Sequence, residues 1–221
     1  MHKNEYYLEI FHEIKNSVAL IDGYLQLLEK KHPAVENHEY WTTIKKENTR
    51  LRKIVTECSQ LRFGTNLYFE CMDLRTFLSD CCNSILSLNH STQLLCHLSL
   101  PETPLWVSID SRQLHHAIIN LLKNACEAMN YNGIISVSAF AENSDVYICI
   151  ADSGSGISPE LLDYIFEPFT TTKEEGSGLG LNISKQIVSA HKGSITVKSQ
   201  KGNGCTFTIT LPQLDKCEKV V

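Results

Sequence analysis

The sequence predicts an α+β chain in two parts, an antiparallel helical hairpin that forms a four-helix bundle on dimerisation and an α/β sandwich that follows it. An apolar heptad seam predicts the hairpin. Short strands interleaved with amphipathic helices predict the sandwich, which ends in a turn at Gly202-Asn203-Gly204. We therefore expect two domains, over residues 1–65 and 66–221.

The spacing of apolar residues defines two long helices in the first part. Residues 6–30 carry apolar side chains at alternating spacings of four and three: Tyr7, Phe11, Ile14, Val18, Ile21, Leu25 and Leu28. Pro33 ends this helix, because the residue before a proline disfavours the helical conformation. A second helix is predicted over 39–62, and the short connection makes the pair antiparallel. One hairpin cannot bury a two-sided seam by itself, so we expect a homodimer.

The second part is predicted to place a helix layer on a mixed sheet. Helices are expected over 73–88, 111–130, 159–164 and 181–191, and strands over 94–100, 106–109, 134–140, 145–151, 194–199 and 205–211. Asp110 or Ser111 caps the helix from 111, since either side chain can accept a hydrogen bond from a free backbone N–H. The last two strands form a hairpin, for which Asn203-Gly204 is a strong turn motif.

Composition limits the class of protein. The chain has 221 residues and a formal net charge of -5, which argues against nonspecific binding to nucleic acid. Its nine cysteines form no CxxC pair and several lie in apolar runs, so we expect reduced, buried thiols in a cytoplasmic protein. We expect no membrane segment, because no apolar run reaches spanning length.

His12 is the first candidate for chemistry. It follows the seam residue Phe11, so its ring is expected to flank the bundle and to face solvent. Neutral imidazole is a competent nucleophile near neutral pH. Glu13 can accept or orient a ring proton, and Asn16 lies one helical turn along. On its own, His12 is more simply an ordinary exposed histidine, one of nine in the chain.

Two asparagines and an aspartate are further candidates. Asn120 and Asn124 lie four apart on one helix face, where their amides could bind a phosphate oxygen or the water shell of a metal; the alternative is a solvated polar face. Asp152 ends an apolar strand and could accept a hydrogen bond from an exocyclic amine such as adenine N6. Gly154 and Gly156 allow close backbone approach, although aspartate–glycine turns end many strands.

A second glycine-rich segment, Gly176-Ser177-Gly178-Leu179-Gly180, opens the last helix, where backbone N–H groups attract anions. It is neither a dinucleotide fingerprint nor a Walker loop, because no βαβ unit and no Gly-Lys-Ser/Thr accompany it. Phe166-Glu167-Pro168-Phe169 and the polar residues up to Lys173 precede it. This segment suits a mobile lid anchored at its base; the alternative is an irregular surface loop.

In combination these motifs resemble the histidine kinase catalytic core of two-component systems and phosphorelays, whose ATP-binding domain has the Bergerat-type (GHKL) fold. Five boxes of that family and a strand motif occur in family order: His12-Glu13-Ile14-Lys15-Asn16, Asn120-Leu121-Leu122-Lys123-Asn124-Ala125, Asp152-Ser153-Gly154-Ser155-Gly156-Ile157, Phe166-Glu167-Pro168-Phe169, Gly176-Ser177-Gly178-Leu179-Gly180-Leu181 and Gly204-Cys205-Thr206-Phe207. Each box is weak alone, but five in order are strong. The hairpin looks most like those of nitrogen-regulatory and sporulation-type kinases.

The resemblance implies a role for each motif. His12 would be the phosphoacceptor, with Glu13 as its acid–base partner and Asn16 beside it. Asn124 would coordinate Mg²⁺, and Asn120 would contact phosphate or the metal shell. The other residues expected to contact ATP are Lys123, Asp152, Gly154, Gly156, Ile157, Phe169, Lys173, Gly176, Gly178, Leu179, Gly180, Leu181 and Thr206. Among these, Asp152 would read the adenine amine and Thr206 would support it through water.

The function implied is an ATP-dependent protein histidine autokinase that passes its phosphoryl group to an aspartate in the receiver domain of a response regulator. The alternatives are a nucleotide-binding pseudo-kinase, scaffold or phosphatase of the same fold, and a GHKL-type ATPase. Ser17-Val18 replaces the family's proline and leucine, so we expect a straighter helix after His12. Because the chain begins eleven residues before His12, we expect either the cytoplasmic part of a longer protein or a short kinase regulated by partners.

Overall fold

A computed structural model describes residues 2–60, 67–88, 93–173 and 176–215, with the side chains of the first range described for 13–57. The chain divides into two compact units, Met1–Asn66 with Phe169–Leu179, and Leu67–Pro168 with Gly180–Val221. The break that the sequence predicts at Gly64-Thr65-Asn66 lies outside the described residues.

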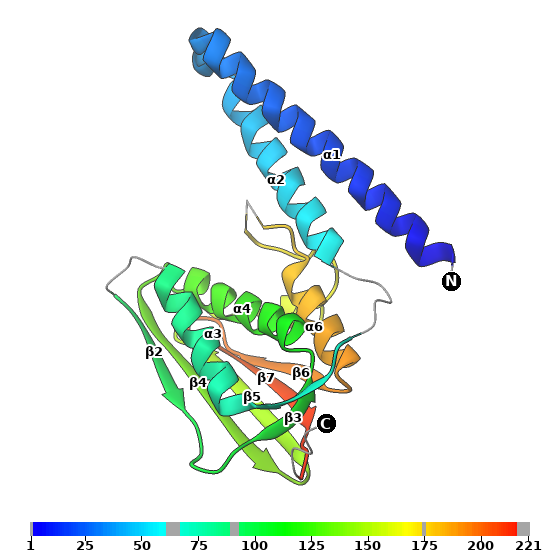
Figure 1. The fold of residues 1–221 in the computed structure, drawn as a ribbon. Helices are drawn as coiled ribbons and strands as arrows, with labels where there is room; N and C mark the ends of the chain where they lie inside the picture. Colours follow the sequence, from blue (N-terminus) through cyan, green and yellow to red (C-terminus); the bar gives the residue numbers. More distant parts are fainter. Residues whose placement is uncertain (1, 61–66, 89–92, 174–175, 216–221) are drawn as a thin grey trace. The chain divides into compact units, whose positions relative to one another are not determined.

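The first unit is built on a helical hairpin (Figure 1). Helix α1 (His2–Lys31) is continuous, a 3-10 turn η1 (Pro33–Asn37) follows it, and α2 (Trp41–Gln60) returns beside it. The predicted end of the first helix at His32-Pro33 is confirmed, because α1 stops at Lys31.

Two carboxylates of α1 tie the two helices together, and we call these contacts the hairpin clasps. The contacts are Trp41 Nε1 to Glu29 Oε1 (3.0 Å), Lys45 Nζ to Glu29 Oε1 (2.5 Å), Asn48 Nδ2 to Asp22 Oδ1 (3.0 Å) and Arg52 Nη1 to Asp22 Oδ2 (3.4 Å). The two acids lie seven residues apart, and each is held by residues four apart on α2. The same arrangement therefore repeats once per heptad and sets the register of the hairpin.

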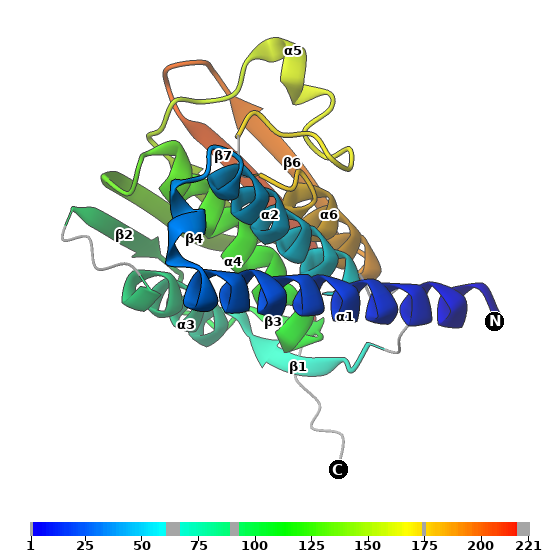
Figure 2. The same ribbon diagram turned by 90° about the horizontal axis from the view of Figure 1, so that it is seen from above.

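The second unit is a two-layer sandwich (Figures 1 and 2). Its main sheet has the strand order β2 (Leu94–Ser99), β4 (Gly133–Glu142), β5 (Asp145–Asp152), β7 (Cys205–Pro212), β6 (Ser194–Ser199). β2 runs parallel to β4 and every other pair is antiparallel. The helices α3 (Leu74–Leu88), α4 (Ser111–Ala128) and α6 (Gly180–Ala190) lie side by side on one face of this sheet.

Two short elements complete the second unit. A separate antiparallel pair, β1 (Glu70–Asp73) with β3 (Trp106–Ile109), lies at the start of the sandwich, and α5 (Pro159–Leu162) precedes the predicted lid. Strand β1 and the 3-10 turn were not predicted from the sequence. The other predicted helices and strands are confirmed, with ends that shift by no more than a few residues.

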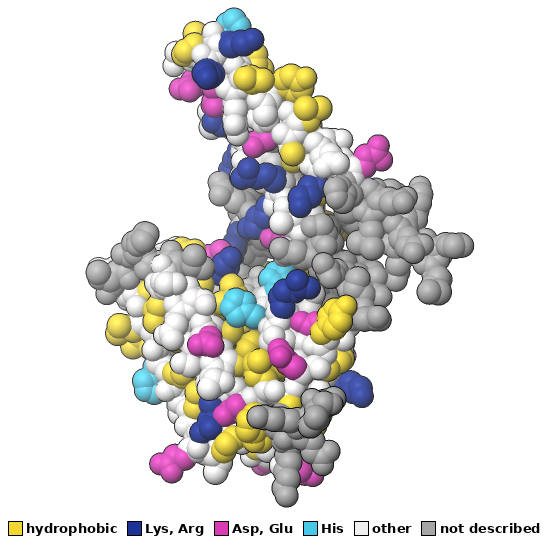
Figure 3. Space-filling view, in the orientation of Figure 1, with side chains coloured by type: hydrophobic (Ala, Val, Ile, Leu, Met, Phe, Trp, Pro, Cys, Tyr) yellow, Lys and Arg dark blue, Asp and Glu magenta, His cyan; other side chains and the backbone are white. Residues whose placement is uncertain are grey.

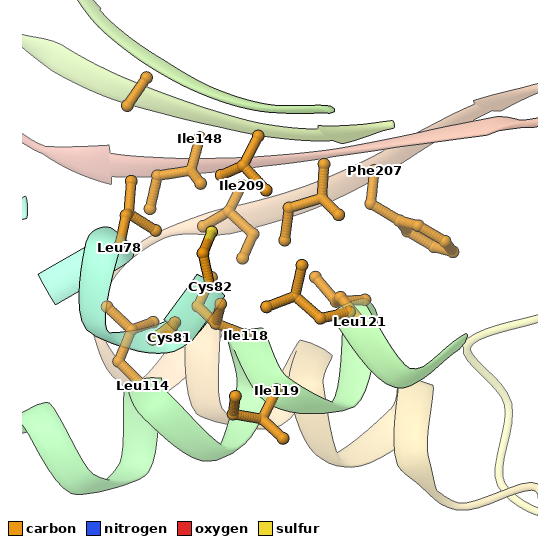
Figure 4. Close-up of a cluster of buried hydrophobic side chains, with 14 of the residues drawn as sticks. Leu78, Cys81, Cys82, Leu114, Ile118, Ile119, Leu121, Ile148, Phe207 and Ile209 are labelled. Atoms are coloured by element: carbon orange, nitrogen blue, oxygen red, sulfur yellow. The ribbon is translucent and has the colours of Figure 1, made fainter. Parts of the chain in front are cut away.

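The core lies between the helix layer and one face of the sheet (Figure 4). Alternate strand residues point into it, as in the cross-strand pair Ile148 and Ile209. They meet Leu78 of α3 and Leu114 and Ile118 of α4, all of which are fully buried. Burying each such side chain contributes about 1.5–3 kcal/mol, so this layer contact holds α4 firmly in place.

The cysteines mostly follow expectation. Free thiols are found at six described positions: Cys81, Cys82, Cys96, Cys126, Cys149 and Cys205. Burial raises the pKa of the Cys81 thiol to about 12, which leaves it unreactive at neutral pH. The expectation that all nine thiols are reduced is wrong at Cys71, which is disulfide-bonded. The side chain of Cys58 and all of Cys217 lie outside the described residues.

Candidate nucleotide site and phosphoacceptor helix

Helix α4 carries the predicted asparagine pair. Asp110 is its N-cap, as predicted: its Oδ1 accepts a hydrogen bond from Gln113 N (3.0 Å). The apolar residues of α4 face the sheet, and the polar residues Asn120, Lys123 and Asn124 lie on the remaining surface, where the two asparagines are half-buried and Lys123 is exposed. The predicted arrangement on one helix follows directly from their spacing.

The side chain of Asn120 is held between α4 and α6. Its Nδ2 donates to Ser184 Oγ (2.9 Å), and Ser184 is fully buried. A Cβ atom added to Gly180 would lie 2.5 Å from Asn120 Oδ1. A glycine is therefore needed at position 180, because the Asn120 amide lies directly over this first residue of α6. The glycine-rich segment and the asparagine box meet at this point.

Asp152 ends β5 with its carboxylate half-buried. Its Oδ1 accepts a hydrogen bond from Gly154 N (2.8 Å). Burial raises the pKa of the Asp152 carboxyl, and the backbone hydrogen bonds from Gly154 and Cys205 oppose this shift without cancelling it. The second carboxylate oxygen is free of the Gly154 bond, so the group can accept a hydrogen bond from an exocyclic amine.

The glycines after Asp152 allow backbone segments to approach one another closely. A Cβ at Gly154 would lie 2.6 Å from Ala128 O, at the end of α4, and one at Gly156 would lie 2.2 Å from Gln200 O. Gly156 also has a φ of +66°. Next to it, Ile157 N donates to Ser199 Oγ (2.8 Å). These contacts fasten the segment to α4 and to the β6–β7 turn.

Thr206 does not lie beside Asp152. It pairs with Ala151, while Asp152 pairs with Cys205. Because successive residues of a strand point to opposite faces, the Thr206 side chain is on the sheet face away from α4, and Cys205 is on the same face as Asp152. The residue on the Asp152 side of the sheet is thus Cys205, one position before the Thr206 that was predicted to support the base. Cys205 is buried, and burial together with the nearby Asp152 carboxylate raises the pKa of its thiol to about 12.

The base of the predicted lid is fixed to the sandwich. Asn182 Nδ2 donates to Phe166 O (2.9 Å), and Lys185 Nζ lies 5.6 Å from the centre of the Phe166 ring. The same ring packs edge-on against Phe207, with centroids 6.3 Å apart. Leu181, also predicted to contact ATP, is half-buried against the core.

The segment after this base is grouped with the first compact unit, whereas Asn120 and Asp152 belong to the second. It contains five predicted contacts of ATP: Phe169, Lys173, Gly176, Gly178 and Leu179. Within this unit, Ser177 Oγ donates to the Glu57 carboxylate of α2 and accepts a hydrogen bond from Leu179 N (3.2 Å). Phe169 and Lys173 are exposed, whereas Leu179 is buried.

The predicted phosphoacceptor lies within α1, but the side chain of His12 is outside the described part of the chain. Glu13 and Asn16 have exposed side chains. Ser17, which stands where the family has proline, donates from Oγ to Glu13 O (3.0 Å). The helix continues through this position, as the missing proline predicts.

Comparison with known proteins identifies the family. Residues 109–215 match the histidine kinase-, DNA gyrase B-, and HSP90-like ATPase family. The chain is 35% identical over 204 residues to the sensor histidine kinase ZraS of Escherichia coli (strain K12), and 37% identical over 202 residues to sporulation kinase D of Bacillus subtilis (strain 168). These matches cover 92% and 91% of this chain. Over nine-tenths of its length, the chain is therefore similar to a sensor histidine kinase and to a sporulation kinase.

The chain spans 44% of the length of ZraS and 40% of that of sporulation kinase D. Its fold agrees with full-length ShkA in complex with AMPPNP (TM-score 0.77, 23% identity, 97% of this chain and 47% of that chain). It also agrees with the histidine kinase ThkA in complex with the response regulator protein TrrA (TM-score 0.68, 27% identity, 95% of this chain and 61% of that chain). The sandwich is therefore a GHKL-type ATPase fold, as predicted. No helix in the described part of the chain is both long and apolar enough to cross a membrane.

One group of residues that stabilises the sandwich was not predicted from the sequence. His191, at the end of α6, is buried and accepts a hydrogen bond at Nε2 from Asp110 N (2.9 Å). Its Nδ1 must then carry the proton, which it donates to Ile187 O (2.7 Å). Asp110 Oδ2 accepts from Tyr68 N (3.1 Å), and the Phe69 ring packs edge-on against His191. We call this group the entry clamp.

Proposed function

We propose that this chain is an ATP-dependent protein histidine autokinase, which phosphorylates His12 and transfers the phosphoryl group to an aspartate in the receiver domain of a response regulator. The observation that carries the proposal is the fixed Asn120 amide over Gly180, in the same sandwich as the half-buried Asp152 carboxylate. An amide oxygen can bind a metal ion on the phosphates or a water held by that metal, and a carboxylate can select adenine by its amine. One matching relative is named a sensor histidine kinase, and another is named a sporulation kinase.

The proposed domains are a dimerisation and phosphoacceptor hairpin over 1–65 and an ATP-binding domain over 66–221. A homodimer is supported by apolar side chains that the hairpin leaves exposed: Ile14, Leu20, Ile21, Tyr24, Leu27, Leu28, Ile44 and Leu51. Figure 3 shows hydrophobic side chains on the surface of the hairpin, with Lys and Arg among them. A four-helix bundle of two hairpins would bury such a surface.

We propose that ATP binds together with Mg²⁺. The described residues contain no cluster of three or more His, Cys, Asp or Glu side chains that could hold a metal by themselves. This fits Mg²⁺, which keeps several waters and is commonly bound through substrate phosphates with few protein ligands. Asn124, with Asn120 beside it, would supply amide oxygens, and the metal would neutralise phosphate charge.

The proposed site residues keep the roles implied by the resemblance, with one exchange. Asp152 would accept from the adenine amine, and Cys205 takes the place of Thr206 beside it. Gly154, Gly156 and Ile157 would form the wall behind the base. Lys123 would reach a phosphate, and the remaining contacts would come from the lid: Phe169, Lys173, Gly176, Gly178, Leu179, Gly180 and Leu181. Glu13 and Asn16 would assist His12.

Incubation with γ-labelled ATP and Mg²⁺ tests the proposal. We expect protein-bound label that is stable in alkali, labile in acid and lost in His12→Ala. His2→Ala is the matched control in the same helix and should keep the label. Chasing the labelled protein with a receiver domain should transfer the label to it. Nucleotide binding without any label in the wild type would instead indicate a pseudo-kinase or scaffold. Steady ATP turnover unaffected by His12→Ala would indicate an ATPase.

A further inference from the structure

Ser184 lies at a position from which it can control the orientation of the Asn120 amide. It is fully buried in the first turns of α6, on the side that packs against α4. Its hydroxyl oxygen is 2.9 Å from Asn120 Nδ2, 3.1 Å from Gly180 O and 3.4 Å from Ala117 O. A buried hydroxyl at the centre of three polar atoms on two helices has little freedom to rotate.

The chemistry of these partners assigns the direction of each hydrogen bond. The carbonyls of Gly180 and Ala117 can only accept, so the single hydroxyl proton of Ser184 goes to them. The hydroxyl oxygen is then an acceptor for Asn120, and only the NH₂ end of the amide can donate to it. A flipped amide would take the hydroxyl proton away from both carbonyls. The orientation in which Nδ2 donates keeps all three contacts of the hydroxyl, so the network favours it.

This orientation leaves Asn120 Oδ1 available. Among the residues that the structure describes, the Asn120 side chain makes one hydrogen bond, from Nδ2 to Ser184 Oγ, and Oδ1 accepts none. The missing side chain of Gly180 provides the space in which the amide lies. An acceptor oxygen fixed in this way is suited to a metal ion or to a water bound by the metal.

We propose that Ser184 is a positioning residue of the nucleotide site, which holds Asn120 with its amide oxygen toward the Mg²⁺-bound phosphates of ATP. The inference rests on the proposed function only in so far as Asn120 belongs to the nucleotide site. It predicts that Ser184 acts on the metal-dependent part of nucleotide affinity, and that it acts through Asn120.

A double-mutant cycle tests this proposal. The affinity of a ribose-labelled fluorescent ATP is measured in Mg²⁺ and in EDTA for wild type, Ser184→Ala, Asn120→Ala and the double variant. We expect Ser184→Ala to weaken binding in Mg²⁺ about five- to tenfold, the usual effect of one lost hydrogen bond, and to change binding in EDTA by less than about twofold. In the Asn120→Ala background, Ser184→Ala should have no further effect. Ser189→Ala, on the exposed side of the same helix, is the matched control.

Three results would overturn the proposal. Ser184→Ala could bind as wild type does in Mg²⁺; it could weaken binding equally in Mg²⁺ and EDTA, as a purely structural defect would; or it could still weaken Mg²⁺-dependent binding when Asn120 is already alanine. Failure of the proposed kinase activity is distinguishable, because it would leave wild-type nucleotide binding intact without label on His12. Absence of nucleotide binding in the wild type would contradict both.

Discussion

Single atoms decide the geometry of the nucleotide site. At Gly180 the absent Cβ makes room for the Asn120 amide, and at Gly154 it makes room for the Ala128 carbonyl. At each position there is room for a hydrogen but not for a methyl group, because an atom of α4 occupies the space that a Cβ would take. The consequence is that conservative changes at these positions should weaken both nucleotide binding and folding.

Gly180→Ala tests this at the helix start. The added methyl would overlap Asn120 Oδ1, so the amide must move away from its place over α6. We expect Mg²⁺-dependent ATP affinity to fall by at least about tenfold, and unfolding free energy by about 1–3 kcal/mol, as for an overpacked core site. Isothermal titration and urea unfolding measure the two effects.

Gly23→Ala is the matched control, because an added Cβ there meets no atom within 4 Å. This exposed residue is in the interior of α1, where alanine is a better helix former than glycine by about 1 kcal/mol. ATP affinity should not change. Equal losses in the two variants would contradict a steric origin for the Gly180 effect.

Asp152 links nucleotide affinity to pH. Its pKa is raised by burial, so the native protein holds this proton to a higher pH than the unfolded chain does. As pH rises through the native value, ionisation costs the native state more than the unfolded state, and Asp152 then lowers stability. Binding to an amine needs the ionised form, so ATP affinity should fall on acidification at a pH above the ordinary aspartate range.

Asp152→Asn separates these two effects. The amide oxygen can keep the bond from Gly154 N, but its NH₂ group cannot accept from adenine. We expect thermal stability at neutral pH equal to or above that of wild type, ATP affinity about 10- to 100-fold weaker, and a smaller loss of affinity on acidification than in wild type, measured by titration at several pH values. If the variant kept wild-type affinity, Asp152 would not be part of the adenine site.

At the scale of elements, the hairpin depends on polar clasps inside an otherwise apolar contact. Asn48 is buried, and its Nδ2 is satisfied by Asp22, whereas its Oδ1 has no partner among the described residues. A buried donor that loses its acceptor costs about 1–3 kcal/mol. Asp22→Ala should therefore destabilise the hairpin by that amount.

The double variant Asp22→Ala/Asn48→Leu should restore most of this loss, because no buried polar group is then left unsatisfied. The effect is measured by urea unfolding in a Trp106→Phe background, followed by tryptophan fluorescence. Trp41 is then the single tryptophan, and it lies in the hairpin. If the double variant were less stable than Asp22→Ala alone, apolar packing rather than hydrogen bonding would be limiting at this position.

The entry clamp makes a similar prediction for the sandwich. His191→Ala removes a buried ring and leaves Asp110 N without its acceptor, so we expect a loss of about 2–4 kcal/mol in unfolding free energy. His97→Ala, at an exposed position of β2, is the matched control and should change stability by less than about 0.5 kcal/mol. Urea unfolding followed by far-UV circular dichroism measures both; equal effects would show that the clamp does not stabilise the fold.

For the whole molecule, local patterns predicted most elements but not their pairing. The heptad spacing and Pro33 define the hairpin, and Asn203-Gly204 defines the last turn. Strand β1 was missed because it is short and pairs with β3, more than thirty residues away. The parallel pairing of β2 with β4 also joins distant segments, which periodicity cannot reveal.

The nucleotide site shows the same limit. Asn120, Asp152 and Gly180 are visible as motifs because their spacing is local. Ser184 is not, since its role depends on how α6 packs against α4. The resemblance implied Thr206, but an alternating strand does not reveal which residue faces Asp152 until the register of its neighbour is known, and the register pairs Asp152 with Cys205.

The entry clamp also defines a path for force. The backbone N–H of Tyr68 donates to Asp110, the N-cap of α4. The ring of Phe69 packs edge-on against His191, which directly follows α6. A pull on the chain before Leu67 would thus load the two helices that carry Asn120 and Gly180 before it reached the strands of the main sheet. We therefore expect tension in the preceding segment to change nucleotide affinity at a lower force than the force that unfolds the main sheet.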